Sequence, residues 1–307
     1  MIPYTRKTLP NGLTVVVNRD RASKLAAVNI LYRVGARNEN PARTGFAHLF
    51  EHLMFRGTRT VENFDLPVQM ASGDNNAFTN NDYTDFYITL PKDNLETALW
   101  LESDRMEGLD ITPAKLEAEK KVVIEEFRQR YLNQPYGDQT MLLRALAYKV
   151  HPYRWAAIGL ATDHIAGATL ADVESFYRTH YRPSNAILSI SADMEEERML
   201  ELAEKWFAPL ADHPSATAAI PQEPMQTQAR RQEVERDVPA STVTVAYHMC
   251  ARTKPDFYTA DLVSDLLSGG DSGRLYTHLV KERNLLSSVN AYICLLYTSD
   301  AADDLTR

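Results

Sequence analysis

Two histidines four residues apart, with a glutamate directly before the second, form the pattern in this chain with the clearest chemistry. The pattern reads His48-Leu49-Phe50-Glu51-His52. On a helix, residues four apart lie on one face, with their Cβ atoms about 5 to 6 Å apart. That separation lets two imidazoles reach one zinc ion at roughly 2.0 to 2.1 Å per nitrogen. The pattern therefore predicts that His48 and His52 bind zinc, and that Glu51 takes a proton from a zinc-bound water.

The neighbours of this pattern bear on the alternative, which is a helix that carries two exposed histidines by chance. Residues 46–55 also contain three Phe, two Leu and one Met, so the segment is apolar on nearly all sides. Burying a charged histidine or an unpaired carboxylate is costly unless something compensates for it. A bound zinc ion would compensate, and the composition of this segment therefore favours a metal site.

A catalytic zinc ion usually has three protein ligands, so two histidines leave one to be found. The candidate lies on a predicted helix that begins near Pro113 and continues to about residue 130. Helical geometry places Glu119 and Glu126 on one stripe of that helix, whereas Glu125 faces solvent. We therefore expect Glu126 to be the third ligand and Glu119 to be a second carboxylate nearby. The alternative is a surface helix with several ion pairs.

The elements that must position these side chains include both strands and helices. Strands are predicted at residues 13–17 and 26–34, and a strand or hairpin at 78–90. Helices are predicted at residues 46–55, at 95–106 and from Pro113 onward. Strands mix with clusters of helices and do not alternate strictly with them, which indicates the α+β class.

The length of 307 residues predicts about two domains. A stretch rich in Pro, Ala, Thr and Gln at residues 215–230 is typical of a linker. Residues 32–37 and 247–252 are loosely similar, at an offset of 215, which suggests a second domain built like the first. We therefore predict a zinc-bearing domain over 1–214, a linker over 215–230 and a partial homologous domain over 231–293.

The end of the chain differs in character from the predicted second domain. Residues 294–304 read Cys-Leu-Leu-Tyr-Thr-Ser-Asp-Ala-Ala-Asp-Asp, which resembles the translation of a sequencing adapter of the transposase type. The alternative is an ordinary polar tail. We expect residues 294–307 to be a non-native tail and the second domain to be truncated.

Composition excludes several classes of protein. Hydrophobic residues make up 44% and charged residues 24%, as in soluble globular proteins. The net charge of −8 disfavours binding to nucleic acid, and no apolar run is long enough to cross a membrane. Two cysteines cannot build a disulfide framework, and the N-terminus has no apolar signal core. We expect a cytoplasmic protein, or a periplasmic one if an N-terminal signal was removed.

Taken together, these motifs resemble the inverted-zincin metallopeptidases of the pitrilysin/insulinase family. The resemblance rests on H-x-x-E-H followed by a distant E-x6-E, and the closest likeness is to bacterial members that are similar to the mitochondrial processing peptidase. Shorter matches lie at residues 9–13, 76–79, 151–153 and 181–185, and the resemblance covers about residues 2–293. It implies two homologous α/β-sandwich domains, each a mostly antiparallel sheet with helices packed on it, of which the second is incomplete here.

The resemblance also implies a role for each matched residue. One zinc ion would be held by His48, His52 and Glu126, with Glu51 as the general base and Glu119 in a supporting catalytic position. The segment that would bind substrate is an edge strand, against which a peptide lies as an added strand; it comprises Asn76, Ala77, Phe78 and Thr79. The alternative for this segment is a plain sheet strand. The implied activity is zinc-dependent endopeptidase hydrolysis of peptides or unfolded polypeptide segments.

Departures from the family pattern concern the second domain. In the family, an Arg and a Tyr that stabilise the transition state occur in a pattern like L-R-x-x-x-G-L-x-Y. Val280 and Ser287 stand at those positions here, and the 215-residue offset places Val263, Leu266 and Leu267 opposite the zinc motif. The second domain is therefore predicted to be metal-free, with a homologous zinc-less partner subunit or a homodimer supplying the Arg and Tyr. The alternative function is that of a non-catalytic assembly or peptide-binding subunit with the same fold.

Overall fold

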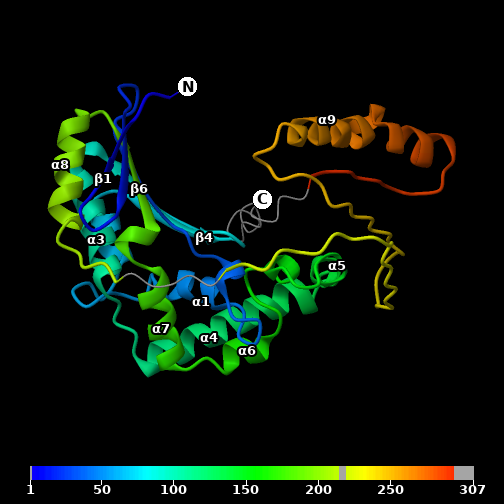
Figure 1. Cartoon of the computed structure of the whole chain (residues 1–307), viewed down its shortest axis with the longest axis horizontal. Helices are drawn as coiled ribbons and strands as arrows, with labels where there is room; N and C mark the ends of the chain where they lie inside the picture. The colour runs from blue at the N-terminus through cyan, green and yellow to red at the C-terminus, as the bar shows by residue number, and fades with distance from the viewer. Residues whose placement is uncertain (1, 214–218, 294–307) are drawn as a thin grey trace. The chain divides into compact units, whose positions relative to one another are not determined.

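The computed structural model describes residues 2–213 and 219–293 (Figure 1). The described residues up to Pro239 form one compact unit, and those from Ala240 onward form a second. These units are compact bodies of the described chain, so the domain limits predicted at 1–214, 215–230 and 231–293 stay predictions. The predicted non-native tail at 294–307 lies outside the described residues.

The first unit contains a six-stranded sheet and the helices that cover it. Its strands are β1 (Thr5–Thr8), β2 (Thr14–Arg19), β3 (Leu25–Tyr32), β4 (Asp74–Thr79), β5 (Thr84–Pro91) and β6 (Ala186–Ala192). Its α-helices are α1 (Phe46–Leu53), α2 (Asp65–Met70), α3 (Leu95–Glu107), α4 (Pro113–Phe127), α5 (Gln139–Ala147), α6 (Thr162–Ala166), α7 (Leu170–His180) and α8 (Glu196–Phe207). The short helical turns are η1 (Ala36–Asn38), η2 (Lys92–Asn94), η4 (Pro152–Arg154) and η5 (Pro183–Asn185), and a π-helical turn, η3 (Arg128–Leu132), extends α4.

The sheet is mostly antiparallel, in the order β1-β2-β6-β3-β5-β4, with β2 and β6 as its parallel pair. Side chains on β3 and β6 alternate between buried and more exposed, as expected for strands that bury one face against a hydrophobic core. Strand β4 pairs with β5 on one side, and no other described strand pairs with it. The strand or hairpin predicted at 78–90 is a hairpin, but its first strand, β4, begins at Asp74, before the predicted range, and lies at the edge of the sheet.

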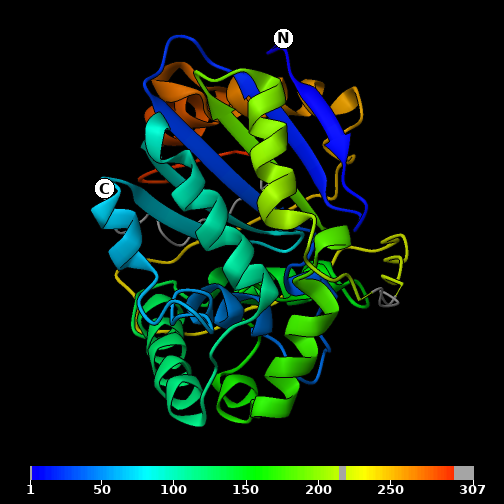
Figure 2. The same ribbon diagram turned by 90° about the vertical axis from the view of Figure 1, so that its left-hand side faces the viewer.

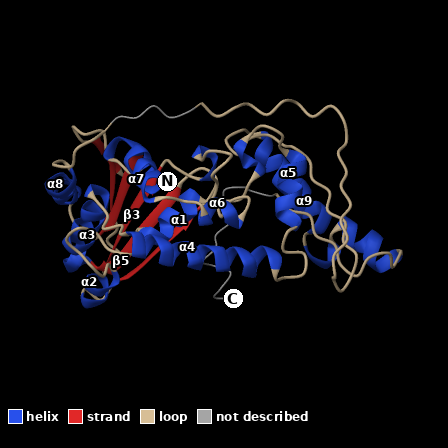
Figure 3. Cartoon of the chain, turned by 90° about the horizontal axis from the view of Figure 1, so that it is seen from below, coloured by secondary structure: helices blue, strands red, loops and turns tan. Residues whose placement is uncertain are grey.

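The sheet lies between two groups of helices (Figures 2 and 3). Helices α3 and α8 pack against each other and against the sheet on one side, whereas α1, α4 and α7 lie on the other. Helix α1 contacts α4, α7 and the edge strand β4, so it occupies the centre of its layer. The α+β prediction is confirmed, and the layers bring together the two helices on which the candidate ligands lie.

The second unit is described by one α-helix, α9 (Asp256–Ser268), and two short turns, η6 (Gly270–Ser272) and the π-helical η7 (Tyr276–Glu282). A second domain built like the first should have a strand before this helix, but the described residues of this unit contain no strand. A strand needs a neighbour for its backbone hydrogen bonds, and none pairs with these residues. Across the described part of the chain, no helix has both the length and the apolar character needed to cross a bilayer.

Candidate metal centre

Gly45 and Glu39 determine where helix α1 starts. Gly45 precedes the helix with a φ of 91°, and a Cβ atom on it would lie 2.6 Å from the Ile158 carbonyl oxygen, so a glycine is needed there. The buried Glu39 carboxylate accepts hydrogen bonds from the backbone N–H groups of Gly45 (2.9 Å) and Ala47 (2.8 Å). These contacts satisfy N–H groups that the first turn of a helix leaves unpaired. The helix therefore begins two residues before His48.

Three predicted ligands meet between α1 and α4. The Nε2 atom of His48 lies 3.0 Å from Glu126 Oε2 and 3.3 Å from His52 Nε2. His52 Nε2 is 3.4 Å from the same carboxylate oxygen, and the possible ligand atoms of the three residues all lie within 4.8 Å of one another. The structure thus brings together two histidines from one helix and a glutamate from another.

These separations fit a single zinc ion. Zinc bonds of about 2.0 to 2.1 Å in a tetrahedral arrangement place neighbouring ligand atoms roughly 3.3 Å apart. The three observed separations are 3.0, 3.3 and 3.4 Å. Two imidazole nitrogens and one carboxylate oxygen are also a ligand set that catalytic zinc sites use. Both the spacing and the chemistry of this cluster therefore suit zinc.

The charges around His48 favour a positive charge in the cluster. Burial lowers the pKa of His48, but the carboxylates of Glu126 and Glu51 outweigh that effect and raise the pKa to about 10. Burial likewise raises the pKa of Glu126, but the two histidines and Arg130 hold it well below its usual range. The cluster accordingly stabilises either a proton or a cation among its carboxylates.

Glu51 lies beside the cluster and faces the second ring nitrogen of His48. Its Oε2 atom is 3.4 Å from His48 Nδ1, and among the described residues this buried oxygen has no hydrogen-bond partner. Burial raises the pKa of Glu51, yet His48 and the Thr79 hydroxyl group outweigh burial and lower it. The side chain is therefore an ionised carboxylate beside the cluster, and a general base must be ionised in this way.

Glu119 contacts the ring nitrogen of His52 that faces away from the other two ligands. Its Oε2 atom lies 3.5 Å from His52 Nδ1, and its Oε1 atom accepts a hydrogen bond from Arg56 Nε at 2.5 Å. Burial raises the pKa of this carboxyl, but His52 and Arg56 outweigh burial and lower it. A carboxylate on the far nitrogen of a ligating imidazole orients the ring and raises its basicity. The geometry therefore suits Glu119 for orienting His52.

The four residues predicted to bind substrate lie on β4, at the edge of the sheet. Ala77 and Thr79 are buried, Phe78 is half-buried against the Tyr83 ring and Asn76 is exposed. Of the four, Thr79 comes near the metal cluster, since its hydroxyl group affects the pKa of Glu51. The other three follow the strand away from the cluster, and their contact with a peptide stays a prediction.

Sequence reasoning missed two arginines and one glutamate at this site. Arg56 follows His52 by four residues and Arg130 follows Glu126 by four, and each pairs with a carboxylate of the site. The i, i+4 spacing from Glu126 is a signal that could have identified Arg130. Arg56 lies beyond the end of α1 and pairs with Glu119 on α4, so no local spacing identifies it. Glu39 has no comparable signal, because its contact with α1 depends on how the intervening loop folds.

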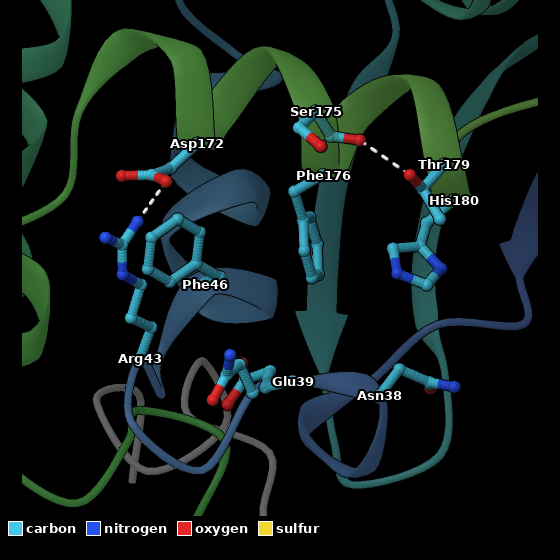
Figure 4. A pocket seen from close by; sticks show the side chains of 10 residues that line it. Asn38, Glu39, Arg43, Phe46, Asp172, Ser175, Phe176, Thr179 and His180 are labelled. Carbon is cyan, nitrogen blue, oxygen red and sulfur yellow. Dashed lines mark hydrogen bonds and ion pairs between the residues drawn. The ribbon is translucent and has the colours of Figure 1, made fainter. Parts of the chain in front are cut away.

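A separate cavity of about 320 Å³ lies at the N-terminus of α1 (Figure 4). Phe46 and Phe176 face it, with Arg43, Glu39 and His180 around them. Burial lowers the pKa of His180 to about 4, so this ring is neutral at pH 7. His48, His52 and Glu126 do not line this cavity, which is therefore distinct from the metal cluster.

Comparisons with known proteins point to one family. Residues 14–156 match the family model described as insulinase, peptidase family M16. Residues 167–302 match the model described as the peptidase M16 inactive domain. The chain is 35% identical over 286 residues to the zinc protease PqqE of Helicobacter pylori, covering 91% of this chain and 64% of that protein.

Other relatives and solved structures agree. A probable mitochondrial-processing peptidase subunit beta of Arabidopsis thaliana is 27% identical, over 83% of this chain and 48% of that protein. The crystal structure of a protease from Helicobacter pylori superposes with a TM-score of 0.84 at 32% identity, covering 94% of this chain and 70% of that one. The chain thus spans less than two thirds of the length of one of these two curated relatives and about half of the other. It belongs to the insulinase family of zinc peptidases, family M16.

Proposed function

We propose that this chain is the zinc-bearing part of an endopeptidase that hydrolyses peptides or unfolded polypeptide segments. The observation that carries this proposal is the cluster of His48, His52 and Glu126, with the ionised Glu51 carboxylate beside it. Membership of a zinc-peptidase family supports the reaction class. The chain spans only part of its relatives, so its activity, substrate and partners are proposals.

The residues divide the chemical work. His48, His52 and Glu126 would hold the ion, and Glu119 would keep the His52 ring in place. Zinc held there would supply Lewis-acid polarisation of the scissile carbonyl and would lower the pKa of the attacking water. Glu51 would accept the proton from that water and then deliver it to the leaving amine. The Oε2 atom of Glu51, which makes no hydrogen bond with the described residues, would be the acceptor for that proton.

Strand β4 supports a mode of binding in which the substrate backbone extends the sheet. Its outer edge is not paired with any described strand, and its C-terminal residue Thr79 lies near Glu51. A peptide that adds to such an edge is held by its main chain, which gives affinity with little dependence on its sequence. We therefore propose that residues Asn76 to Thr79 align extended substrates with the metal cluster.

Zinc content tests the site directly. We expect about one zinc per chain in the wild type and sharply less in Glu126→Gln, because an amide replaces one of three charged or imidazole ligands. Glu125→Gln is the matched control, since Glu125 is adjacent in sequence but exposed. Elemental analysis of the three proteins, purified identically, is the measurement. A folded wild type without zinc would contradict the proposal and favour an assembly or peptide-binding role.

We also propose that hydrolysis needs a homologous zinc-less partner subunit or a second copy of the chain. Val280 and Ser287 occupy the positions of the Arg and Tyr that the family pattern contains. A relative named as a beta subunit of the mitochondrial processing peptidase supports a multi-subunit arrangement. We expect the purified monomer to hydrolyse an unstructured peptide weakly at most, and a partner chain that carries the Arg and Tyr to increase the rate.

The partner proposal is checked by assaying size-exclusion fractions for peptide hydrolysis and for zinc. A zinc-loaded monomer with full peptidase activity would contradict it. The cellular compartment stays a prediction, with the cytoplasm expected and the periplasm as the alternative. One solved structure that shares the fold at 22% identity is titled as a periplasmic protease from Escherichia coli.

A further inference from the structure

The last stretch of the first unit, residues 219–239, has no assigned helix or strand, yet three of its charged side chains bind to the rest of that unit. Figure 1 shows this yellow segment passing alongside α5. Glu223 and Arg230 are half-buried, while the apolar Met225 between them is 88% exposed. Charged contacts therefore hold this segment in place, and hydrophobic burial contributes little.

Glu223 binds three consecutive backbone N–H groups. Its Oε1 atom accepts from Lys149 N at 2.8 Å, and its Oε2 atom accepts from Val150 N and His151 N, both at 2.9 Å. Three N–H groups that converge on one carboxylate form an anion-binding concavity. Hydrogen bonds to a charged acceptor are stronger than those between neutral groups. This contact fixes the backbone of residues 149–151.

Two arginines continue the attachment along α5 in the opposite direction. Arg230 Nη1 donates to the carbonyl oxygens of Leu146 and Ala147, both at 2.9 Å, in the last turn of that helix. A cation at this position also interacts favourably with the helix dipole. Arg236 donates from Nε and Nη2 to Asp138 Oδ2, at 3.0 and 2.8 Å, at the N-terminus of α5. The three attachments together span the whole of α5.

The segment that Glu223 binds also supports the turn between β4 and β5. Tyr153 Oη donates to both carboxylate oxygens of Asp82, at 2.6 and 2.7 Å. Asn81 Nδ2 donates to the Trp155 carbonyl oxygen at 3.0 Å, and Arg144 donates to Asn81 Oδ1 at 2.8 Å. Residues 149–155 thus connect the Glu223 contact to the end of the edge strand.

We propose that Glu223, Arg230 and Arg236 form a latch, and that Glu223 is a positioning residue for substrate binding. By fixing the backbone of residues 149–151, Glu223 holds Tyr153 and Trp155 against the β4–β5 turn. The turn in turn sets the position of β4, where an extended peptide would lie. The effect on peptide affinity rests on the proposed function, whereas the effect on the β4–β5 turn does not.

Amide hydrogen exchange on the full chain tests the latch without any assay of activity. In Glu223→Ala, we expect the amides of residues 149–151 to exchange about tenfold faster or more, because their charged acceptor is gone. The amides of Asp82 and Tyr83, which donate to Asn80 Oδ1 in the turn, should also exchange roughly two- to fivefold faster. Glu223→Gln keeps an acceptor oxygen without the charge and should give intermediate rates.

Glu235→Ala is the matched control, since Glu235 lies on the same segment and its side chain is exposed. Its exchange rates should equal those of the wild type. With an active enzyme, Glu223→Ala should raise KM for a peptide about three- to tenfold with kcat within about twofold, because binding geometry changes and the chemical groups do not.

Three results would overturn the proposal. Unchanged exchange at residues 149–151 in Glu223→Ala would show that the carboxylate does not hold them. Faster exchange there with no change at Asp82 and Tyr83 would show that the latch does not position the turn. Faster exchange at both places with an unchanged KM in an active enzyme would remove the link to substrate. If the zinc-loaded wild type hydrolyses no peptide even with a partner chain that carries the Arg and Tyr, the proposed function fails, while exchange at the turn still decides the latch.

Discussion

Replacing Glu51 with Gln is expected to abolish peptide hydrolysis while leaving zinc content unchanged. The amide keeps the shape of the side chain but cannot accept the proton of an attacking water. General base catalysis contributes about 10² to 10⁴ in rate, so kcat should fall by at least that range. The zinc content should persist because Glu51 is outside the three-residue cluster. Peptide hydrolysis and elemental analysis on the same preparation, in the active assembly, measure both quantities.

Glu125→Gln again provides the control, because it makes the same chemical change at an exposed position of α4. It should retain the wild-type rate. Hydrolysis by Glu51→Gln within about tenfold of the wild type would show that another group accepts the proton. Loss of zinc together with loss of activity would place Glu51 among the groups that maintain the metal site, which contradicts the role as base.

The second large effect is expected on stability, from Arg105→Met in α3. Arg105 is 1% exposed and donates from Nε (2.8 Å) and Nη2 (2.5 Å) to the fully buried Glu102. Its guanidinium group also lies over the rings of Phe64 and Phe86, at 4.4 and 4.2 Å from their centroids. Removing one partner of a buried ion pair leaves an uncompensated charge and costs about 3 to 5 kcal/mol. Urea-induced unfolding should show a decrease in the free energy of unfolding of that size.

The double variant Glu102→Leu/Arg105→Met distinguishes two contributions to the loss of stability. One is the loss of the ion pair itself, and the other is the cost of leaving Glu102 buried without a partner. Replacing both partners by apolar groups of similar volume is often close to neutral. We therefore expect the double variant to be more stable than Arg105→Met alone. If Arg105→Met lowers the free energy of unfolding by less than about 1 kcal/mol, the ion pair contributes little to the stability of the core.

The sequence by itself determined the local part of the site. His48, Glu51 and His52 occupy one short helix, and helical geometry alone places residues four apart on one face. The same reasoning placed Glu119 and Glu126 on a common stripe of α4 and Glu125 in solvent, as the structure has them. The second strand of the hairpin, β5, was also predictable, because it is rich in β-formers, whereas the start of β4 at Asp74 lies before the predicted range of 78–90.

Some local details departed from these predictions. The helical period places Val122 on the same stripe as Glu119 and Glu126. In the structure its side chain is 44% exposed and does not join the buried face of α4. The helix itself ends at Phe127 and continues as a π-helical turn. Element ends depend on contacts that the helical period does not contain.

Only the tertiary structure decided how distant segments meet. Seventy-eight residues separate His48 from Glu126, and their contact depends on α1 and α4 packing on the same side of the sheet. Strand β6 inserts between β2 and β3 although it follows them by more than 150 residues, and no local pattern specifies such a neighbour. The Glu39 contact with α1 and the Glu223 contact with residues 149–151 are of the same kind. In each, a carboxylate accepts hydrogen bonds from backbone N–H groups. Such groups can serve as donors to a distant side chain only after the fold has brought the two segments together, so the sequence alone does not reveal them.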